Sequence, residues 1–285
     1  MKWNVKQPTT YRPMAWKRGN GRATQIHIEP ESMSIQDAFH WRISTAHVTV
    51  GPFSTFDGYT RTITLLKGRP LVLFHKQRPL EPAEIEHHVP YTFNGGWDTD
   101  AIYKSEQRTT LSHSTEAFSK ATPQTSNPCA AVVSIKNLSN SSSTLPTYDA
   151  DNSDAFYFNV ISQDDAVQHR CATYSFSQIG ESLILSGRGS DSCKDNLTSP
   201  RTLVIYSYNG DVNVRHDHQD GGYQSVKLMS GSTLIIEDID KQTPQQQQAI
   251  SQSSASLPPP PPPPFKLCLT SCTNDTRILV VHLDP

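Results

Sequence analysis

The sequence has no run of about 18 consecutive apolar residues, the length that a helix needs to cross a bilayer. Its first residues, MKWNVKQPTT, lack the apolar core of a secretory signal. Charge of one sign is also missing, since 25 lysines and arginines stand against 27 aspartates and glutamates. Balanced, scattered charge gives no electrostatic reason for binding nucleic acid or an anionic membrane. We therefore expect a cytoplasmic protein with neither kind of partner.

Signatures of the common enzyme classes are absent as well. The chain has no nucleophile elbow, no phosphate-binding loop and no dinucleotide fingerprint, so hydrolase, kinase and dehydrogenase mechanisms lose their usual support. Cysteine is scarce, and its five residues form neither a zinc pattern nor a redox CxxC motif. We expect no cofactor and reduced thiols.

The chain is instead rich in short runs of Val, Ile, Leu, Tyr and Thr bounded by turn residues, which are typical of β-strands. The ten clearest runs are residues 45–50, 61–66, 70–74, 155–161, 181–186, 202–208, 211–215, 232–238, 266–270 and 277–283. The clearest hairpin signal is Asn209–Gly210, which suits a type I′ turn between two of these runs. The pattern predicts an all-β barrel or sandwich with two similar halves.

Three segments have too little apolar content to contribute much core. Residues 105–128 and 137–154 are rich in Ser, Thr and Asn, and residues 241–264 run from a glutamine tract into seven prolines. We expect insertions or loops here. The tract Pro258–Pro264 has two interpretations, a polyproline ligand for an SH3- or WW-type partner and a stiff spacer in a loop.

Two arginines lie within the strand-like residues 41–68. In an extended strand Arg42 and Ser44 share a face with apolar side chains further along, and so does Arg61 in its own strand. Both arginines therefore sit at the end of an apolar face. The pattern is mixed, because Trp41 makes the opposite face of the first strand apolar too.

A guanidinium stays charged, and burying it unpaired costs on the order of several kcal/mol, so a buried arginine needs a carboxylate or an anionic ligand. The candidate internal partners are Glu29, Asp57, Asp98 and Asp100. An internal pair would make the arginines part of the architecture. The other interpretation is a pocket for a small carboxylate, which arginine binds through two parallel hydrogen bonds.

The segment GPFSTFDGY between the two strands is too long for a tight hairpin. Its turn residues suit an ordered lid or corner, with Phe53 and Phe56 tucked back onto the sheet.

One ordered series of residues, with a later continuation, resembles the HutD/Ves family. Its members are Trp16-Lys17, Asn20-Gly21, Thr24, Trp41-Arg42, Ser44, Ala46, Val48, Gly51 to Ser54, Phe56, Gly58-Tyr59, Arg61, Leu65-Leu66, Gly68 and Phe158-Asn159-Val160. The chain departs from the family pattern in its start, WKRGNG, in a long insertion before Phe158, and in Tyr157, where the pattern has an aspartate.

The resemblance implies an all-β, double-cupin (bicupin) fold of jelly-roll type with disordered insertions. It also implies a protein that binds a small metabolite without known chemistry. The expected parts are a first cupin-like barrel at 1–104, a low-complexity insertion at 105–153, a second half with a crossover strand at 154–240, a Gln/Pro-rich loop at 241–264 and the final strands at 265–285.

We expect the first half to hold a small carboxylate-type metabolite, without metal and without catalysis. The arginines would supply charge, three polar residues would supply hydrogen bonds, and a tryptophan would form an apolar wall. The expected ligand-binding residues are Arg42, Arg61, Ser44, Trp41, Asn20, Thr24 and Trp16. A homodimer is left open as a further partnership.

The alternative is a metal-dependent cupin enzyme, an oxygenase or isomerase. Catalytic cupins carry an HxH pair, and His216-Asp217-His218 matches that part, with His47 as a candidate third ligand. The match then fails, because the glutamate that should follow is absent and the pair lies in a polar, turn-like segment, RHDHQDGG. A solvated loop is the competing interpretation of the two histidines.

Overall fold

The computed structural model describes residues 1–15, 22–48, 50–104, 155–186, 202–218, 220–237 and 265–284. Its strands are β1 (Lys2–Lys6), β2 (Arg12–Ala15), β3 (Arg22–Glu29), β4 (Trp41–Val48), β5 (Gly51–Pro52), β6 (Tyr59–Lys67), β7 (Leu71–His75), β8 (Ala83–Ile85), β9 (Tyr91–Asn94), β10 (Thr99–Tyr103), β11 (Ala155–Gln163), β12 (Gln168–Phe176), β13 (Ser182–Ser186), β14 (Thr202–Asn209), β15 (Val212–Asp217), β16 (Tyr223–Leu228), β17 (Thr233–Glu237), β18 (Lys266–Ser271) and β19 (Thr276–Asp284). A 3-10 turn, η1 (Pro8–Thr10), follows β1. None of the described residues forms a helix long and apolar enough to cross a membrane.

The strands build four antiparallel sheets, which pair into two sandwiches. In the first sandwich a six-stranded sheet, ordered β2-β3-β4-β11-β6-β9, faces a four-stranded sheet, β5-β10-β7-β8. In the second, a five-stranded sheet, β1-β17-β14-β19-β12, faces a four-stranded sheet, β13-β18-β15-β16. The predicted all-β fold with two similar halves is confirmed, although each half is a pair of facing sheets and no closed barrel is found among the described residues.

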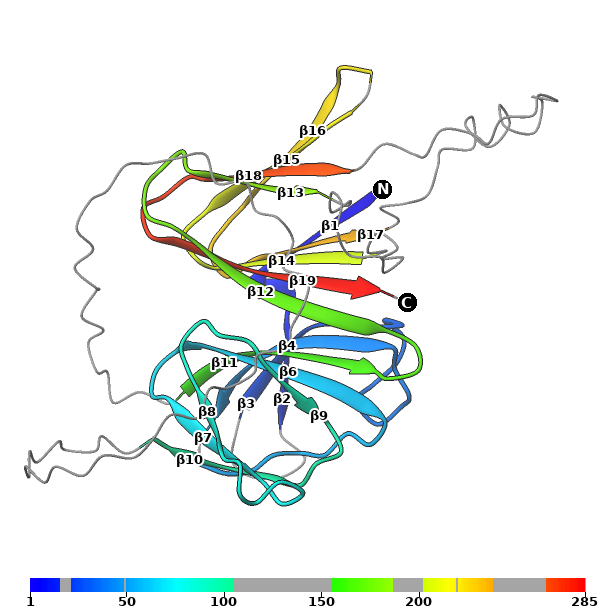
Figure 1. Ribbon diagram of the computed structural model, residues 1–285. Coiled ribbons are helices and arrows are strands. Elements are labelled where there is room, and N and C mark those ends of the chain that lie inside the picture. The colour runs from blue at the N-terminus through cyan, green and yellow to red at the C-terminus, as the bar shows by residue number, and fades with distance from the viewer. Residues whose placement is uncertain are drawn as a thin grey trace, which may run out of the picture.

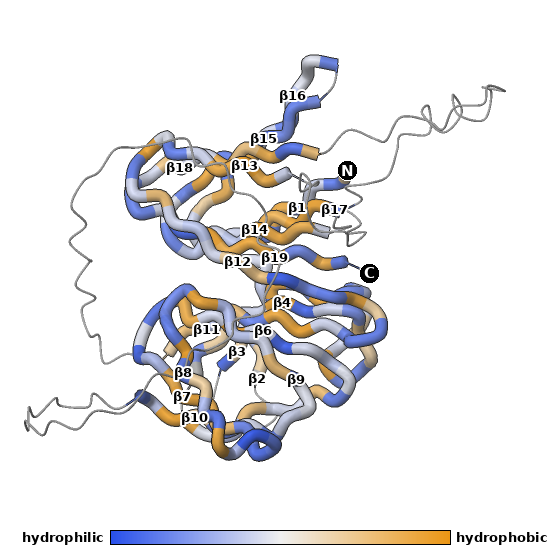
Figure 2. Tube along the Cα trace, viewed as in Figure 1, coloured by the Kyte–Doolittle hydropathy of each residue, from blue (hydrophilic) through white to orange (hydrophobic). Residues whose placement is uncertain are grey.

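The two sandwiches stack through their larger sheets, so the protein has four layers (Figure 1). One core cluster joins the six-stranded to the five-stranded sheet and includes Trp41, Ile43, Val204 and Val281. In Figure 2 the strands β14, β17 and β19 are mainly hydrophobic, as expected for a sheet covered on both faces. The same double coverage explains why both faces of β4 are apolar.

Each sandwich contains one strand from the half of the chain that builds most of the other sandwich. The N-terminal strand β1 pairs with β17 in the second sandwich. Conversely, β11 is inserted between β4 and β6 in the first sandwich (Figure 1). The division of the chain expected at residues 104 and 154 would assign β1 to the first half and β11 to the second. In the structure each of these two strands belongs to the other sandwich.

Each of the ten runs that we read as strands overlaps a strand of the structure, with differences of one or two residues at some ends. The hairpin expected at Asn209–Gly210 is wrong, because β14 pairs with β17 and β19, whereas β15 pairs with β16 and β18. The turn carries the chain from one sheet of the second sandwich to the other. Only Gly210 of the two residues has a positive φ, 72°, so the turn is not of type I′.

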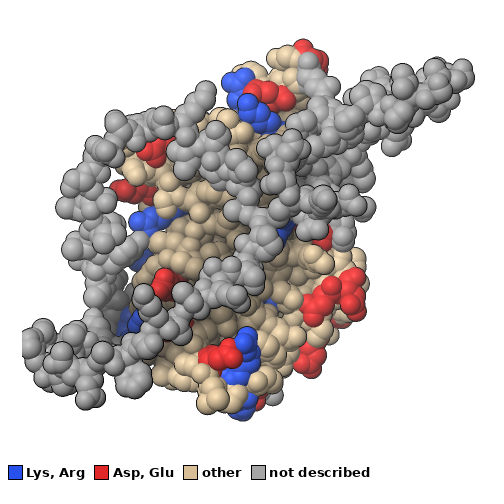
Figure 3. Space-filling view, viewed as in Figure 1, with Lys and Arg blue, Asp and Glu red and all other residues tan. Residues whose placement is uncertain are grey.

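Two other expectations concern segments outside the described residues. They are the insertion at 105–153 and the Gln/Pro-rich loop with Pro258–Pro264. On the face seen in Figure 3, basic and acidic side chains lie in small groups among uncharged residues. Among the described residues Cys171, Cys268 and Cys272 are free thiols.

Candidate functional site

The two arginines singled out from the sequence lie in one row across the six-stranded sheet. Arg42 on β4 and Arg61 on β6 are each in register with Ile161 on β11, the strand between them. One row further, Ser44 is in register with Asn159. Since paired residues of antiparallel strands point to the same face, all five side chains project into the interior of the first sandwich.

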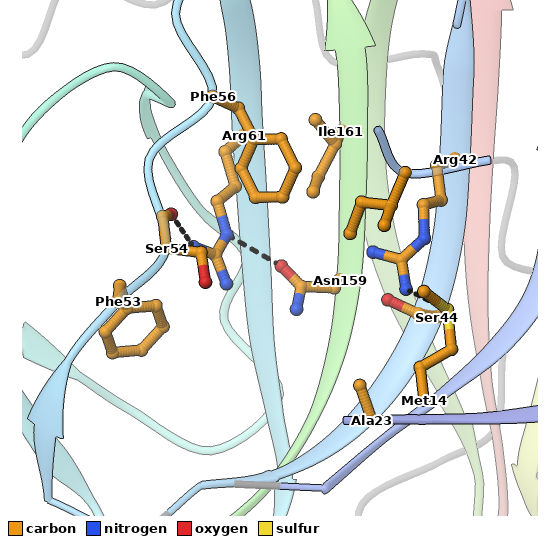
Figure 4. A pocket seen from close by; sticks show the side chains of 11 residues that line it. Met14, Ala23, Arg42, Ser44, Phe53, Ser54, Phe56, Arg61, Asn159 and Ile161 are labelled. Carbon is orange, nitrogen blue, oxygen red and sulfur yellow. Dashed lines mark hydrogen bonds between the residues drawn. The ribbon is translucent and has the colours of Figure 1, made fainter. Parts of the chain in front are cut away.

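This part of the interior is a pocket. Its empty space, including the solvent at its mouth, is about 450 Å³. Figure 4 shows the two guanidinium groups on either side of Asn159, with Ser44 beside Arg42. The lining consists of Met14, Ala23, Ile35, Arg42, Ser44, Phe53, Ser54, Phe56, Arg61, Asn159 and Ile161.

Neutral groups anchor both guanidinium groups. Arg42 donates from Nε to Oε1 of Gln25 at 3.0 Å and from Nη2 to the sulfur of Met14 at 3.3 Å. Arg61 donates from Nε to Oδ1 of Asn159 at 2.9 Å and from Nη1 to the carbonyl oxygen of Ser54 at 3.5 Å. These bonds satisfy part of the five N–H donors of each arginine and none of its charge.

The expected internal carboxylates do not pair with the arginines. Arg42 is 4% exposed and Arg61 is 5% exposed, yet neither forms a salt bridge with any carboxylate of the described residues. Asp98 pairs with Lys76 at 2.6 Å, and Glu29 lies 3.3 Å from His27. Within the described part of the chain, the architectural interpretation thus lacks the counter-charge that it requires.

Burial without a counter-charge affects the protonation of both groups. Burial lowers the pKa of Arg42 to about 10. Burial, together with the smaller effect of the nearby positive charge on Arg42, lowers the pKa of Arg61 to about 9. Both values lie above neutral pH, so two positive charges remain in the pocket under physiological conditions.

The pocket also holds an unsatisfied hydroxyl. Ser44 is 1% exposed, and its Oγ has no hydrogen-bond partner among the described residues. Buried polar atoms in native proteins nearly always have a partner, from the protein, from water or from a ligand. The Ser44 hydroxyl is therefore a donor that is available inside the pocket.

The corner between β5 and β6 covers one side of the pocket. Phe53 and Phe56 are buried there, as the sequence predicted. The Phe53 backbone N–H donates to the carbonyl oxygen of Thr99, and that of Phe56 donates to the carbonyl oxygen of Gly95, each at 2.8 Å. The guanidinium of Arg61 lies 4.6 Å from the centre of the Phe53 ring, which is a cation–π distance.

The other predicted ligand-binding residues do not join this group. Trp41 has the opposite parity to Arg42 and packs in the core between the sandwiches, against His27 at 4.7 Å between ring centres. Thr24 is in register with Thr45, which points to the opposite face of β4 from Arg42 and Ser44. Thr24 therefore does not line the pocket. Trp16 and Asn20 lie outside the described residues.

Several residues that line the pocket or hold its arginines escaped the sequence analysis. Gln25 and Met14 carried no signal that distinguished them from ordinary strand residues. Asn159 did carry one, because it lies in the Phe158-Asn159-Val160 series that supported the family resemblance. Its place beside Arg61 depends on the pairing of β11 with β6, which the sequence does not reveal.

The alternative metal ligands do not converge. His216 and His218 lie at the end of β15 in the second sandwich, with ring centres 5.0 Å apart, and His216 Nδ1 contacts the carbonyl oxygen of Lys266 at 3.0 Å. His47 lies on β4 of the first sandwich, with its ring tilted by 40° against that of Phe156 at 4.7 Å between ring centres. The described residues contain no group of three or more His, Cys, Asp or Glu side chains that could hold a metal ion.

Comparison with known proteins supports the family resemblance that was drawn from the residues around Arg42 and Arg61. The family model described as HutD matches residues 8–112. The resemblance to the HutD/Ves family is confirmed for this part of the chain. A 21.2 kDa protein from the hutC 3′ region of Pseudomonas putida, described as uncharacterized, is 43% identical over 76 residues, which are 25% of this chain and 39% of that protein. Protein Ves of Citrobacter koseri is 33% identical over 91 residues, which are 32% of this chain and 43% of that protein.

The whole chain also resembles solved structures, including two from Pseudomonas species. A conserved protein of unknown function from Pseudomonas aeruginosa has a TM-score of 0.62 at 16% identity, with 100% of both chains covered. HutD from Pseudomonas fluorescens has a TM-score of 0.56 at 16% identity, with 99% of this chain and 98% of that chain covered. At this identity the likeness establishes the fold. The sequence alignments with the HutD-region and Ves proteins span about two fifths of those relatives.

Proposed function

We propose that this HutD/Ves-like protein binds a small anionic metabolite, without catalysis and without a metal, in the pocket between Arg42 and Arg61. The observation that carries the proposal is the pair of buried guanidinium groups that no carboxylate of the described residues neutralises. Effective burial of an unpaired ion costs on the order of several kcal/mol. A bound anion would supply the missing charge.

The polar groups around the arginines suit a carboxylate. Arginine presents parallel N–H donors that match the two oxygens of a carboxylate. The Ser44 hydroxyl is buried and has no hydrogen-bond partner in the described part of the chain, so it could donate to the same ligand. Phe53, Phe56 and Ile161 supply the apolar walls that exclude water and strengthen these interactions.

Thermal unfolding in the presence of small carboxylates tests this function. At a fixed ionic strength and pH 7.5, at least one carboxylate is expected to raise the Tm of the wild-type protein. Arg42→Gln and Arg61→Gln are each expected to weaken that effect at least about tenfold in concentration, because a charge-assisted pair contributes about 1.5–3 kcal/mol. Circular dichroism verifies that the variants are folded.

Arg215→Gln is the matched control. Arg215 is an exposed arginine on β15 of the second sandwich, paired with Asp217 at 2.6 Å. Its replacement is expected to leave the ligand response unchanged. If no carboxylate stabilises the wild-type protein, or if Arg215→Gln reduces the response as much as the pocket variants do, the proposal fails. Elemental analysis of protein from metal-supplemented cells tests the metal-free part separately.

A further inference from the structure

Among the described residues, the lining of the pocket carries two positive charges and no negative one. Of the eleven side chains that line it, Arg42 and Arg61 are the charged ones. The next side chain on the same face of β11 is Tyr157, which is 1% exposed and neutral, and its hydroxyl has no hydrogen-bond partner among the described residues. The described side chains next to the pocket on β11 therefore supply no negative charge to balance the two arginines.

A ligand with one negative charge would balance only one of the two positive charges on Arg42 and Arg61. The two guanidinium groups also disfavour each other, since the charge of Arg42 contributes to the lowered pKa of Arg61. Full compensation requires two negative charges in the same space.

The geometry separates the two cations. Their strands are next-nearest neighbours in the sheet, which places the two backbones roughly 9–10 Å apart. Figure 4 shows the Asn159 side chain between the two guanidinium groups. Because Gln25 holds Nε of Arg42 and Asn159 holds Nε of Arg61, each arginine directs its remaining donors into the pocket from its own side.

We propose that the ligand is a small dicarboxylate, with one carboxylate group on Arg42 and Ser44 and the other on Arg61. This inference rests on the proposed function and narrows it to a ligand class. The neutral lining between the arginines, including Ile161, faces the short carbon chain that joins the two carboxylates.

Matched acids of equal chain length test the charge requirement. Calorimetry and thermal unfolding would compare malonate with propionate, succinate with butyrate, and glutarate with valerate, each at constant ionic strength and pH 7.5. The best dicarboxylate is expected to bind at least about tenfold more tightly than its monocarboxylate counterpart. Inorganic phosphate and sulfate form a further arm, because they concentrate their charge on one tetrahedral centre.

The variants test the two-point arrangement. Arg42→Gln and Arg61→Gln are each expected to abolish the dicarboxylate advantage, so that both acids of a pair bind with the same weak affinity. Ser44→Ala serves as a variant with little risk to folding, and it should weaken the dicarboxylate severalfold. Arg215→Gln should retain the advantage.

The outcomes separate this inference from the proposed function. If a monocarboxylate binds as well as its dicarboxylate counterpart, the dicarboxylate inference is wrong while the anion pocket stands. If phosphate or sulfate binds more tightly than every dicarboxylate, the ligand class is again wrong. If no anion binds the wild-type protein, both proposals fail together.

Discussion

Asn159 accepts a hydrogen bond from Nε of Arg61 at 2.9 Å, although the two residues are 98 positions apart in the chain. The bond forms because β11 is inserted between β4 and β6. The same insertion aligns Asn159 with Ser44. The pocket is therefore complete only when the chain has returned from beyond residue 154.

Replacing Asn159 with aspartate supplies Arg61 with the carboxylate that it lacks. We expect Asn159→Asp to raise the free energy of unfolding of the ligand-free protein by about 1–2 kcal/mol, since a hydrogen bond gains charge assistance. Carboxylate binding should weaken at least about tenfold, because the internal acid competes with the ligand. Chemical denaturation and calorimetry measure the two effects.

The uncharged control for this change is Asn159→Leu. It removes the acceptor of Arg61 and should destabilise the protein by about 1–3 kcal/mol. A variant Asn159→Asp that binds carboxylates like the wild type would contradict the assignment of Arg61 to the ligand.

Ser44→Ala removes a buried hydroxyl that has no partner in the described residues. The ligand-free protein should keep its stability within about 1 kcal/mol, because no hydrogen bond is lost. Ligand binding should weaken by about 1 kcal/mol, because the hydroxyl no longer donates to the anion. Denaturation with and without ligand distinguishes the two states, and a loss of stability in both to the same degree would assign Ser44 a structural role instead.

Two half-buried histidines at the contact between the sandwiches, His88 and His169, predict a loss of stability in mild acid. His169 on β12 bonds Thr62 of β6 through Nε2 and Ser162 of β11 through Nδ1. His88 contacts the hydroxyl of Tyr208 on β14. Burial lowers the pKa of each histidine to about 4.

The direction of the effect follows from proton uptake. An unfolded histidine takes up its proton near pH 6.5, whereas these folded ones do so near pH 4, so the unfolded state binds more protons in between. Stability should therefore be complete above about pH 6.5 and fall as the pH drops toward 4, with His169 alone accounting for roughly 2–3 kcal/mol. His169→Gln should flatten the curve of Tm against pH over this range. The exposed His218→Gln is the control, and identical curves for wild type and His169→Gln would refute the prediction.

Gly210 occupies a position that no other residue fits. Its φ is 72°, and an added Cβ would lie 2.3 Å from Oγ1 of Thr273 and 2.6 Å from Oγ1 of Thr276. Gly210→Ala should lower the free energy of unfolding by roughly 2–4 kcal/mol through strain and overpacking. Gly221→Ala shares the positive φ but meets no atom within 4 Å, so it should cost about 1–2 kcal/mol. Equal effects in urea denaturation would show that the close approach at Gly210 is unimportant.

The sequence predicted the parts of this fold that depend on local pattern. Alternation placed Arg42 and Ser44 on one face, and the aromatic residues of the β5–β6 corner fold back as expected. The sequence also showed that Trp41 is an apolar residue on the second face of β4, but not what it packs against. We expected Trp41 to form a wall of the pocket, whereas it packs against the five-stranded sheet of the second sandwich.

What the sequence could not reveal is pairing between distant strands. Asn209–Gly210 has the local signature of a hairpin, yet a turn signal does not determine whether the flanking strands pair or diverge into different sheets. Likewise nothing near Asn159 indicates that β11 lies between β4 and β6. These pairings depend on the burial of whole sheets, which short sequence windows do not record.

The exchange of β1 and β11 makes the two sandwiches distinct in space but inseparable along the chain. A cut anywhere between residues 104 and 155 leaves an N-terminal fragment that retains an edge strand of the second sandwich and lacks an inner strand of the first. Each fragment would thus hold a strand that completes the other's sheet. We therefore expect two separately made pieces to reassemble, with the pocket between Arg42 and Arg61 complete only in the mixture.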